Sequence, residues 1–204
     1  MEEKWLTWAK ELQALAQAGL TYGKDVFDKE RYTRIKEISA EILSEQTHIE
    51  VKNIMNIFCG ETGYQTPKLD SRAVIVEGDK ILLVEEKDGR WALPGGWVDV
   101  DQSIRSNTEK EVKEEAGLDV QAVRILMLHD RNQHNEPSYA FNVCKVFVEC
   151  HVIGGAFVEN VETISSAYFD IEQLPILAEE KVNKEQIMTC MKAIKDPLWQ
   201  VEFD

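Results

Sequence analysis

The sequence lacks any long uninterrupted run of apolar residues. A membrane-spanning helix needs roughly 20 such residues, and no apolar stretch in the chain approaches that length. The opening segment, MEEKWLTWAKEL, is acidic and amphipathic, unlike a signal peptide, which has a basic start and an apolar centre. We therefore expect a cytoplasmic protein with no membrane span and no targeting segment.

Cysteine is scarce. Cys59, Cys144, Cys150 and Cys190 show neither a CxxC pair nor the spacing of a zinc site. We expect reduced, mostly buried thiols, as is usual in the cytosol.

Positive charge is also in short supply. The chain has 23 Lys and Arg against 37 Asp and Glu, which gives a net charge of -14 at pH 7. A broad surface of this sign repels nucleic acid and anionic membranes, so neither is an expected partner. A small positive pocket, or a metal ion that reverses the sign locally, is still compatible with this composition.

The first 58 residues have the apolar spacing of three and four that is typical of helices. In the first helix these residues are Trp5, Trp8, Leu12, Leu15 and Ala16. Gly19 and Gly23 are expected to break this helix, and Asp28 to cap the next one. The segment has no catalytic cluster, so we expect a small helical domain whose apolar face needs a cover.

Residues 59–66 are rich in Gly and Thr and predict a linker, and residues 67–204 are rich in β-strand patterns. Expected strands span 72–78, 80–87, 90–98, 122–130, 139–152 and 165–171, and expected helices span 103–116 and 179–194. Ser103 and Gly117 have the residue types that start and stop the first of these helices. This order predicts an α+β or α/β fold with a mixed sheet between helices.

The strongest chemical signal is the acidic end of the helix expected at 103–116. Successive helical residues turn by about 100°, so Glu111, Glu114 and Glu115 share one face. Carboxylate oxygens on a rigid face suit Mg²⁺ or Mn²⁺. A solvated acidic surface is the alternative that the helix alone leaves open.

The surrounding residues resemble the Nudix box, G-x5-E-x7-R-E-U-x-E-E-x-G-U, where U is aliphatic. Seven of its nine fixed positions match: Gly96, Glu111, Val112, Glu114, Glu115, Gly117 and Leu118. The preceding Leu93-Pro94-Gly95 is also similar to the family. Gln102 and Lys110 depart from it, because the family has Glu and Arg there.

Three further runs, GGWVDV, HDRNQH and GGAFVENVET, resemble a Nudix subgroup with an extra N-terminal helical domain. The resemblance implies a Nudix α/β/α sandwich over 67–204, with 1–58 as the extra domain. It further implies hydrolysis of the pyrophosphate bond of a nucleoside diphosphate linked to another group, such as CDP-choline or ADP-ribose. Mg²⁺ is the implied cofactor, with Mn²⁺ as a substitute, and a homodimer is the implied assembly.

The same resemblance implies roles for individual residues. Glu111, Glu114 and Glu115 would hold the metal together with the carbonyl of Gly95, and Glu111 and Glu114 would count among the catalytic residues. The general base is expected on a loop after the box, where Glu162 is preferred over Glu159.

Contacts with the substrate are expected from three positive or polar side chains, Arg72, Arg131 and His134, because the oxygens of a diphosphate need hydrogen-bond donors. His134 is also a second candidate for the base. Trp91 and Trp97 flank the glycines and are candidates for stacking on a nucleobase or for the core.

Two other functions fit the same residues. One is hydrolysis of RNA ends or phosphodiesters by the same metal site. The other is a Nudix-like nucleotide-binding regulatory module without catalysis, for which Gln102 and Lys110 are the argument.

Overall fold

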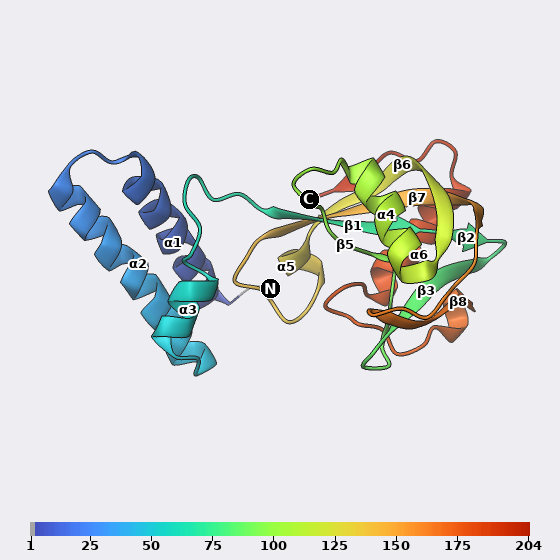
Figure 1. The fold of residues 1–204 in the computed structure, drawn as a ribbon, viewed down its shortest axis with the longest axis horizontal. Helices are drawn as coiled ribbons and strands as arrows, with labels where there is room; N and C mark the ends of the chain where they lie inside the picture. Colours follow the sequence, from blue (N-terminus) through green and yellow to red (C-terminus); the bar gives the residue numbers. More distant parts are fainter. Residues whose placement is uncertain (1–2) are drawn as a thin grey trace. The chain divides into compact units, whose positions relative to one another are not determined.

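The computed structural model describes residues 3–204, which form two compact units (Figure 1). The first contains the residues up to Pro67 together with Ser138–Asn142, and the second contains Lys68–Pro137 with Val143–Asp204. Among the helices of the described residues, none is long and apolar enough to cross a bilayer.

The first unit is helical. Its elements are α1 (Lys4–Tyr22), α2 (Val26–Thr47) and α3 (Val51–Ile57). The helices α1 and α2 run antiparallel as a hairpin (Figure 1). The core they share with α3 consists of Leu6, Ala9, Ala40, Leu43, Ile54, Phe58 and Cys59. Phe141, from the segment Ser138–Asn142, packs edge-on against Phe58 with 5.8 Å between ring centroids.

Two expected helix boundaries in this unit are wrong. Asp25, and not Asp28, caps α2, because its side chain accepts hydrogen bonds from two backbone N–H groups of the first turn. Gly19 lies inside α1, and only Gly23 ends the helix. A Cβ at Gly19 would lie 2.4 Å from the ring of Tyr32, so glycine there lets this ring pack on the helix backbone.

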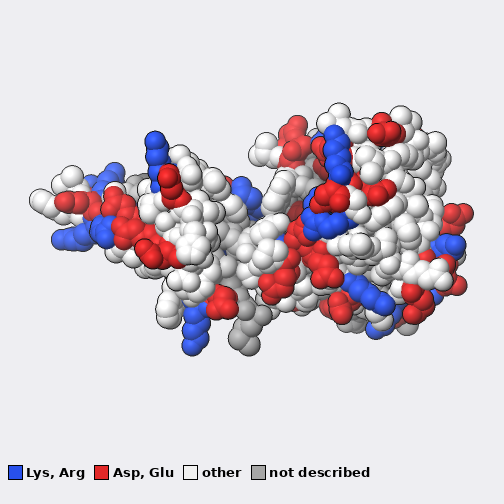
Figure 2. All heavy atoms as spheres, turned by 90° about the horizontal axis from the view of Figure 1, so that it is seen from below, with Lys and Arg blue, Asp and Glu red and all other residues white. Residues whose placement is uncertain are grey.

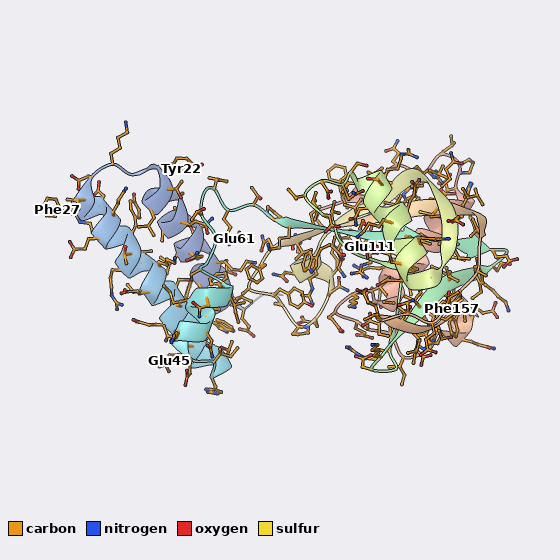
Figure 3. All side chains as sticks on the ribbon, viewed as in Figure 1. Tyr22, Phe27, Glu45, Glu61, Glu111 and Phe157 are labelled. Carbon is orange, nitrogen blue, oxygen red and sulfur yellow. The ribbon has the colours of Figure 1, made fainter. Side chains whose placement is uncertain are left out.

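Much of the apolar surface of α1 and α2 stays exposed in the single chain. Trp8 and Leu15 are each 57% exposed, although the spacing placed them on the apolar face of the first helix. Tyr22 and Phe27, both exposed, lie at the same end of the hairpin (Figure 3). The helical unit therefore has a second apolar face beyond the one that forms its own core.

The second unit contains two β-sheets. Its strands are β1 (Lys68–Val74), β2 (Val76–Glu77), β3 (Lys80–Glu86), β4 (Trp91–Ala92), β5 (Gly95–Trp97), β6 (Leu118–Asp130), β7 (Val143–Gly155), β8 (Thr163–Asp170) and β9 (Glu202–Phe203). The larger sheet has the order β5-β1-β7-β6-β9 and is mixed, because β1 pairs with β7 and β6 with β9 in parallel. The smaller sheet, in which β3 pairs with β2, β4 and β8, is antiparallel.

Two helices cover opposite faces of these sheets, as strand alternation requires. On β1, Ala73 packs in a cluster with Val112 of α4 (Ile104–Ala116), whereas its neighbour Val74 packs with Ile187 of α6 (Lys184–Lys195). The buried residues of β3 divide in the same way. The expected α+β fold, with a mixed sheet between helices and a helical N-terminal region, is confirmed.

Three expected elements of this unit have different limits. The strand expected over 90–98 is split, because β4 and β5 belong to different sheets. The last helix starts at Lys184, where Asn183 forms a capping box, and not at residue 179. The strand expected from residue 139 begins at Val143, because 138–142 belong to the helical unit.

Candidate active site

The helix α4 is fixed at both ends and along its buried side. Ser103 caps it and Gly117, at φ 70°, ends it, as the sequence predicted. Asn107 is fully buried, donates a hydrogen bond to Ser71 Oγ at 3.1 Å and accepts one from the backbone N–H of Asp99 at 3.1 Å. These bonds hold α4 against β1 and against the loop that precedes it.

Glu115 is bound to the glycine turn. Its Oε2 accepts a hydrogen bond from the N–H of Gly95 at 2.7 Å. Gly95 has φ +141°, and a Cβ there would lie 2.0 Å from the carbonyl oxygen of Ser71, so only glycine fits. Burial raises the pKa of Glu115 to about 7, although the charge of Arg72 and the Gly95 N–H partly oppose this rise.

Glu111 lies one helical turn earlier and faces Gly96. A Cβ on Gly96 would come within 2.9 Å of Glu111 Oε2, so the missing side chain leaves room for this carboxylate. Burial raises the pKa of Glu111 above its ordinary value, with Lys110 opposing the rise and Glu114 adding to it. Figure 3 labels Glu111 in the second unit.

Glu114 is turned toward solvent. Its side chain is 56% exposed, and its Oε2 lies 3.3 Å from Lys110 Nζ. Lys110 also donates to Asp99 Oδ2 at 3.1 Å. Within residues 3–204, no three His, Cys, Asp or Glu side chains converge as a metal cluster.

A hollow of about 290 Å³ lies beside α4, and we call it the acidic hollow. It is lined by Glu86, Lys87, Asp88, Glu115, Val161, Glu162, Thr163 and Lys181. The structure thus brings Glu162 together with Glu115, and the charge of Glu162 also contributes to the raised pKa of Glu111. Glu159 is exposed and does not line the acidic hollow.

The loop that carries Glu162 is tied to the end of α4. Thr163, which is buried, donates its hydroxyl hydrogen to the carbonyl oxygen of Glu115 at 2.6 Å. Asn160 donates to Thr163 Oγ1 at 2.7 Å and accepts from the N–H of Glu162 at 2.9 Å. Neither Asn160 nor Thr163 was singled out from the sequence, although both lie in the VENVET stretch.

The two arginines expected to contact substrate are buried instead. Arg72 donates to Asp70 Oδ1 at 2.9 Å and to the carbonyl of Leu93 at 3.3 Å. Arg131 is 1% exposed and donates to the carbonyl of Glu180 at 3.3 Å. Neither lines the acidic hollow, and the hydrogen bonds of both hold backbone and side chains inside the unit.

His134, the third expected contact, lies at the C-terminal strand. Its Nε2 is 2.8 Å from Asp204 Oδ1, and its ring stacks on His129 with 3.8 Å between centroids. It is not among the residues that line the acidic hollow.

The two tryptophans differ in their surroundings. Trp91 is partly buried and packs edge-on against Phe169, with 4.7 Å between ring centroids, so it belongs to the core. Trp97 is 52% exposed and follows Gly96 on β5, which leaves its face open for stacking.

A buried lysine was missed by sequence reasoning. Lys145, on β7, is 2% exposed and donates from Nζ to the carbonyl oxygens of Glu180 and Lys181. Burial, and after it the nearby charge of Arg72, lower its pKa to about 6. The available signal was a single lysine inside a long apolar strand.

Known protein families match both units of the chain. Residues 67–190 match the family described as NUDIX domain, and residues 3–58 match the family described as UDP-X-like, N-terminal oligomerisation domain. A protein of Bacillus subtilis (strain 168), "Putative ADP-ribose pyrophosphatase YjhB", is 35% identical over 205 residues, covering 100% of this chain and 99% of the relative. The ADP-ribose pyrophosphatase of Methanocaldococcus jannaschii is 29% identical over 128 residues, covering 60% of this chain and 74% of the relative.

Two crystal structures are also similar. An ADP-ribose pyrophosphatase from Streptococcus suis 89-1591 is 49% identical with a TM-score of 0.64, and it covers 68% of this chain and 100% of its own. A UDP-X diphosphatase is 32% identical with a TM-score of 0.65 over 98% of both chains. The chain therefore belongs to the Nudix hydrolase family, whose members typically depend on a divalent metal, and it is a Nudix pyrophosphohydrolase.

Proposed function

We propose that the protein hydrolyses the pyrophosphate bond of ADP-ribose and releases AMP and ribose 5-phosphate. The observation that carries this proposal is the pair of partly buried carboxylates on α4, Glu111 and Glu115, beside a hollow that Glu162 also lines. The choice of ADP-ribose rests on the relatives, since three of them bear that substrate in their names. CDP-choline and a UDP-linked compound are the alternatives within the same class.

The carboxylates of α4 fit a bound Mg²⁺, for which Mn²⁺ is a chemical substitute. Glu111 and Glu115 are partly buried and have raised pKa values. A cation bound between them would stabilise their ionised form. We propose Glu111, Glu115 and the carbonyl of Gly95 as ligands, and Glu114 as a further ligand once it leaves Lys110. The cation would neutralise negative charge on the diphosphate.

We propose Glu162 as the general base. It accepts a proton from the water molecule whose oxygen attacks one phosphorus of the diphosphate. The bond between that phosphorus and the bridging oxygen breaks, and the bridging oxygen leaves with the other phosphate. The bonds from Thr163 and Asn160 keep the loop of this base against α4.

We further propose the domain division 1–58, 59–66 and 67–204, with the first part joining two copies as a homodimer. The exposed apolar face of α1 and α2 supports this, because an isologous contact would bury it in both copies. We propose a small nucleotide as the substrate, and not a nucleic acid. RNA is disfavoured, because on the face drawn in Figure 2 acidic side chains lie among the basic ones, and no continuous positive groove is seen there.

A panel of substrates tests the proposal. Purified protein is incubated with ADP-ribose, CDP-choline, a UDP-sugar, ATP and 5′-triphosphorylated RNA, in Mg²⁺, Mn²⁺ or EDTA, and the products are separated by chromatography. We expect AMP and ribose 5-phosphate as the preferred products, in the presence of metal only. Preferred release of pyrophosphate from ATP, or preferred cleavage of the RNA, would contradict it.

A further inference from the structure

The negative charge of the acidic hollow opposes the binding of an anionic substrate. Four of the residues that line it are carboxylates: Glu86, Asp88, Glu115 and Glu162. A bound cation offsets part of this charge, but a diphosphate also needs donors from the protein. The expected Arg72, Arg131 and His134 do not line the hollow, so any donors inside it belong to other residues.

Only two cationic residues line the acidic hollow over the described part of the chain, Lys87 and Lys181. Lys87 is exposed in the turn between β3 and β4. Lys181 is partly buried, with a side chain 36% exposed. Its charge also opposes the rise in the pKa of Glu115, so it acts electrically on the carboxylate at the centre of the site.

The backbone of Lys181 is anchored from several sides. Its N–H donates to the carbonyl of Ala178 at 2.7 Å, and the N–H of Ala178 donates to the carbonyl of Trp91 at 2.8 Å. The buried Lys145 donates to the carbonyl of Lys181 itself. The position from which the Lys181 side chain extends into the hollow is therefore fixed.

Among residues 3–204, one carboxylate forms an ion pair with the ammonium of Lys181. Its Nζ lies 2.5 Å from Glu86 Oε1, at the edge of the same hollow. An ammonium group has three donors, so this ion pair leaves donors for a second anionic oxygen.

We propose that Lys181 binds a phosphate oxygen of the substrate diphosphate in the acidic hollow, and that Glu86 holds its ammonium there before substrate arrives. This inference rests on the proposed function and adds to it a substrate-binding residue. Lys145 serves as a positioning residue, since it does not line the hollow and donates to the backbone carbonyls of Glu180 and Lys181.

The test measures binding and turnover separately. The probe for binding is α,β-methylene-ADP with Mg²⁺, whose carbon bridge cannot be hydrolysed, measured by calorimetry. The probe for turnover is ADP-ribose. The variants are Lys181→Met, Lys181→Arg, Glu86→Gln and Lys87→Met, the last at the other lysine of the hollow. Lys184→Met is the matched control, because Lys184 is an exposed lysine outside the hollow.

We expect Lys181→Met to weaken binding of the probe roughly 10- to 100-fold, as for loss of one hydrogen bond to a charged group. The KM for ADP-ribose should rise by a similar factor, Lys181→Arg should recover part of the loss, and Lys184→Met should behave as wild type. Glu86→Gln should keep most of the affinity, which separates a phosphate contact from a merely structural ion pair.

Three results would overturn the inference: an unchanged affinity in Lys181→Met, the same loss in Glu86→Gln as in Lys181→Met, or a loss in Lys87→Met instead. Failure of the proposed function would look different. In that case wild type would not hydrolyse ADP-ribose, while the binding comparison would still decide the role of Lys181.

Discussion

Replacing Glu115 with Gln should stabilise the metal-free protein while removing its activity. Glu115 has a pKa of about 7 in the folded chain against an ordinary value of 4.5. Each pKa unit corresponds to about 1.36 kcal/mol, so keeping this carboxylate ionised at high pH destabilises the metal-free fold by up to roughly 3 kcal/mol. Gln carries no charge, and its amide oxygen can still accept the hydrogen bond from Gly95.

The direction in which stability changes with pH follows from proton binding. Because the folded pKa is raised, the folded state binds the proton more tightly than the unfolded state does. The stability of metal-free wild type therefore falls as pH rises from about 4.5 to about 7, and it stays reduced above that pH. The difference between Glu115→Gln and wild type should vanish at about pH 4.5 and be complete at about pH 8.

Thermal unfolding in EDTA measures the effect. For a chain of this size each kcal/mol changes Tm by roughly 2–4 °C, so Glu115→Gln should melt about 5–10 °C above wild type at about pH 8. Glu114→Gln is the control, because Glu114 is 56% exposed and should change little. Added Mg²⁺ should raise the Tm of wild type much more than that of Glu115→Gln. If Glu115→Gln melts below wild type at about pH 8 in EDTA, Glu115 is not the buried carboxylate with a raised pKa described above.

Other predictions concern the base, the glycine turn and the assembly. Glu162→Gln should lower kcat by roughly 10²- to 10⁴-fold without changing Tm, and steady-state kinetics showing nearly wild-type kcat would remove Glu162 from that role. Gly96→Ala should push the Glu111 carboxylate away, since a Cβ would lie 2.9 Å from its Oε2, and the Mg²⁺ concentration for half-maximal activity should rise; an unchanged value would count against Glu111 as a ligand. Trp8→Glu combined with Leu15→Glu should convert dimer to monomer in light scattering, because both side chains are exposed in the single chain, and a monomeric wild type would rule out the dimer.

The sequence predicted the catalytic helix well because its signals are local. Helical spacing, the cap at Ser103 and the stop at Gly117 act within a few residues, and all three are as expected. The direction of Glu114 was not predictable in this way. It depends on Lys110, which Asp99 draws toward the preceding loop, and that loop is placed by tertiary contacts of Asn107.

Longer-range features also escaped the sequence. The run around Leu93 and Pro94 resembles one strand, but its two halves join different sheets, which only the assembled sandwich decides. Phe141 alternates like a strand residue, yet it packs with Phe58 in the helical unit. Arg72 and Arg131 have the chemistry of phosphate ligands, but the sequence did not show that both are buried and donate to acceptors within the unit.

The most direct test of the central claim is hydrolysis of ADP-ribose in ¹⁸O-labelled water with Mg²⁺, followed by mass spectrometry of both products. The account predicts equal amounts of AMP and ribose 5-phosphate, with one ¹⁸O in one of the two, and no products from Glu115→Gln. Products in which neither phosphate carries ¹⁸O, or full activity in Glu115→Gln, would contradict cleavage of the pyrophosphate bond at this site.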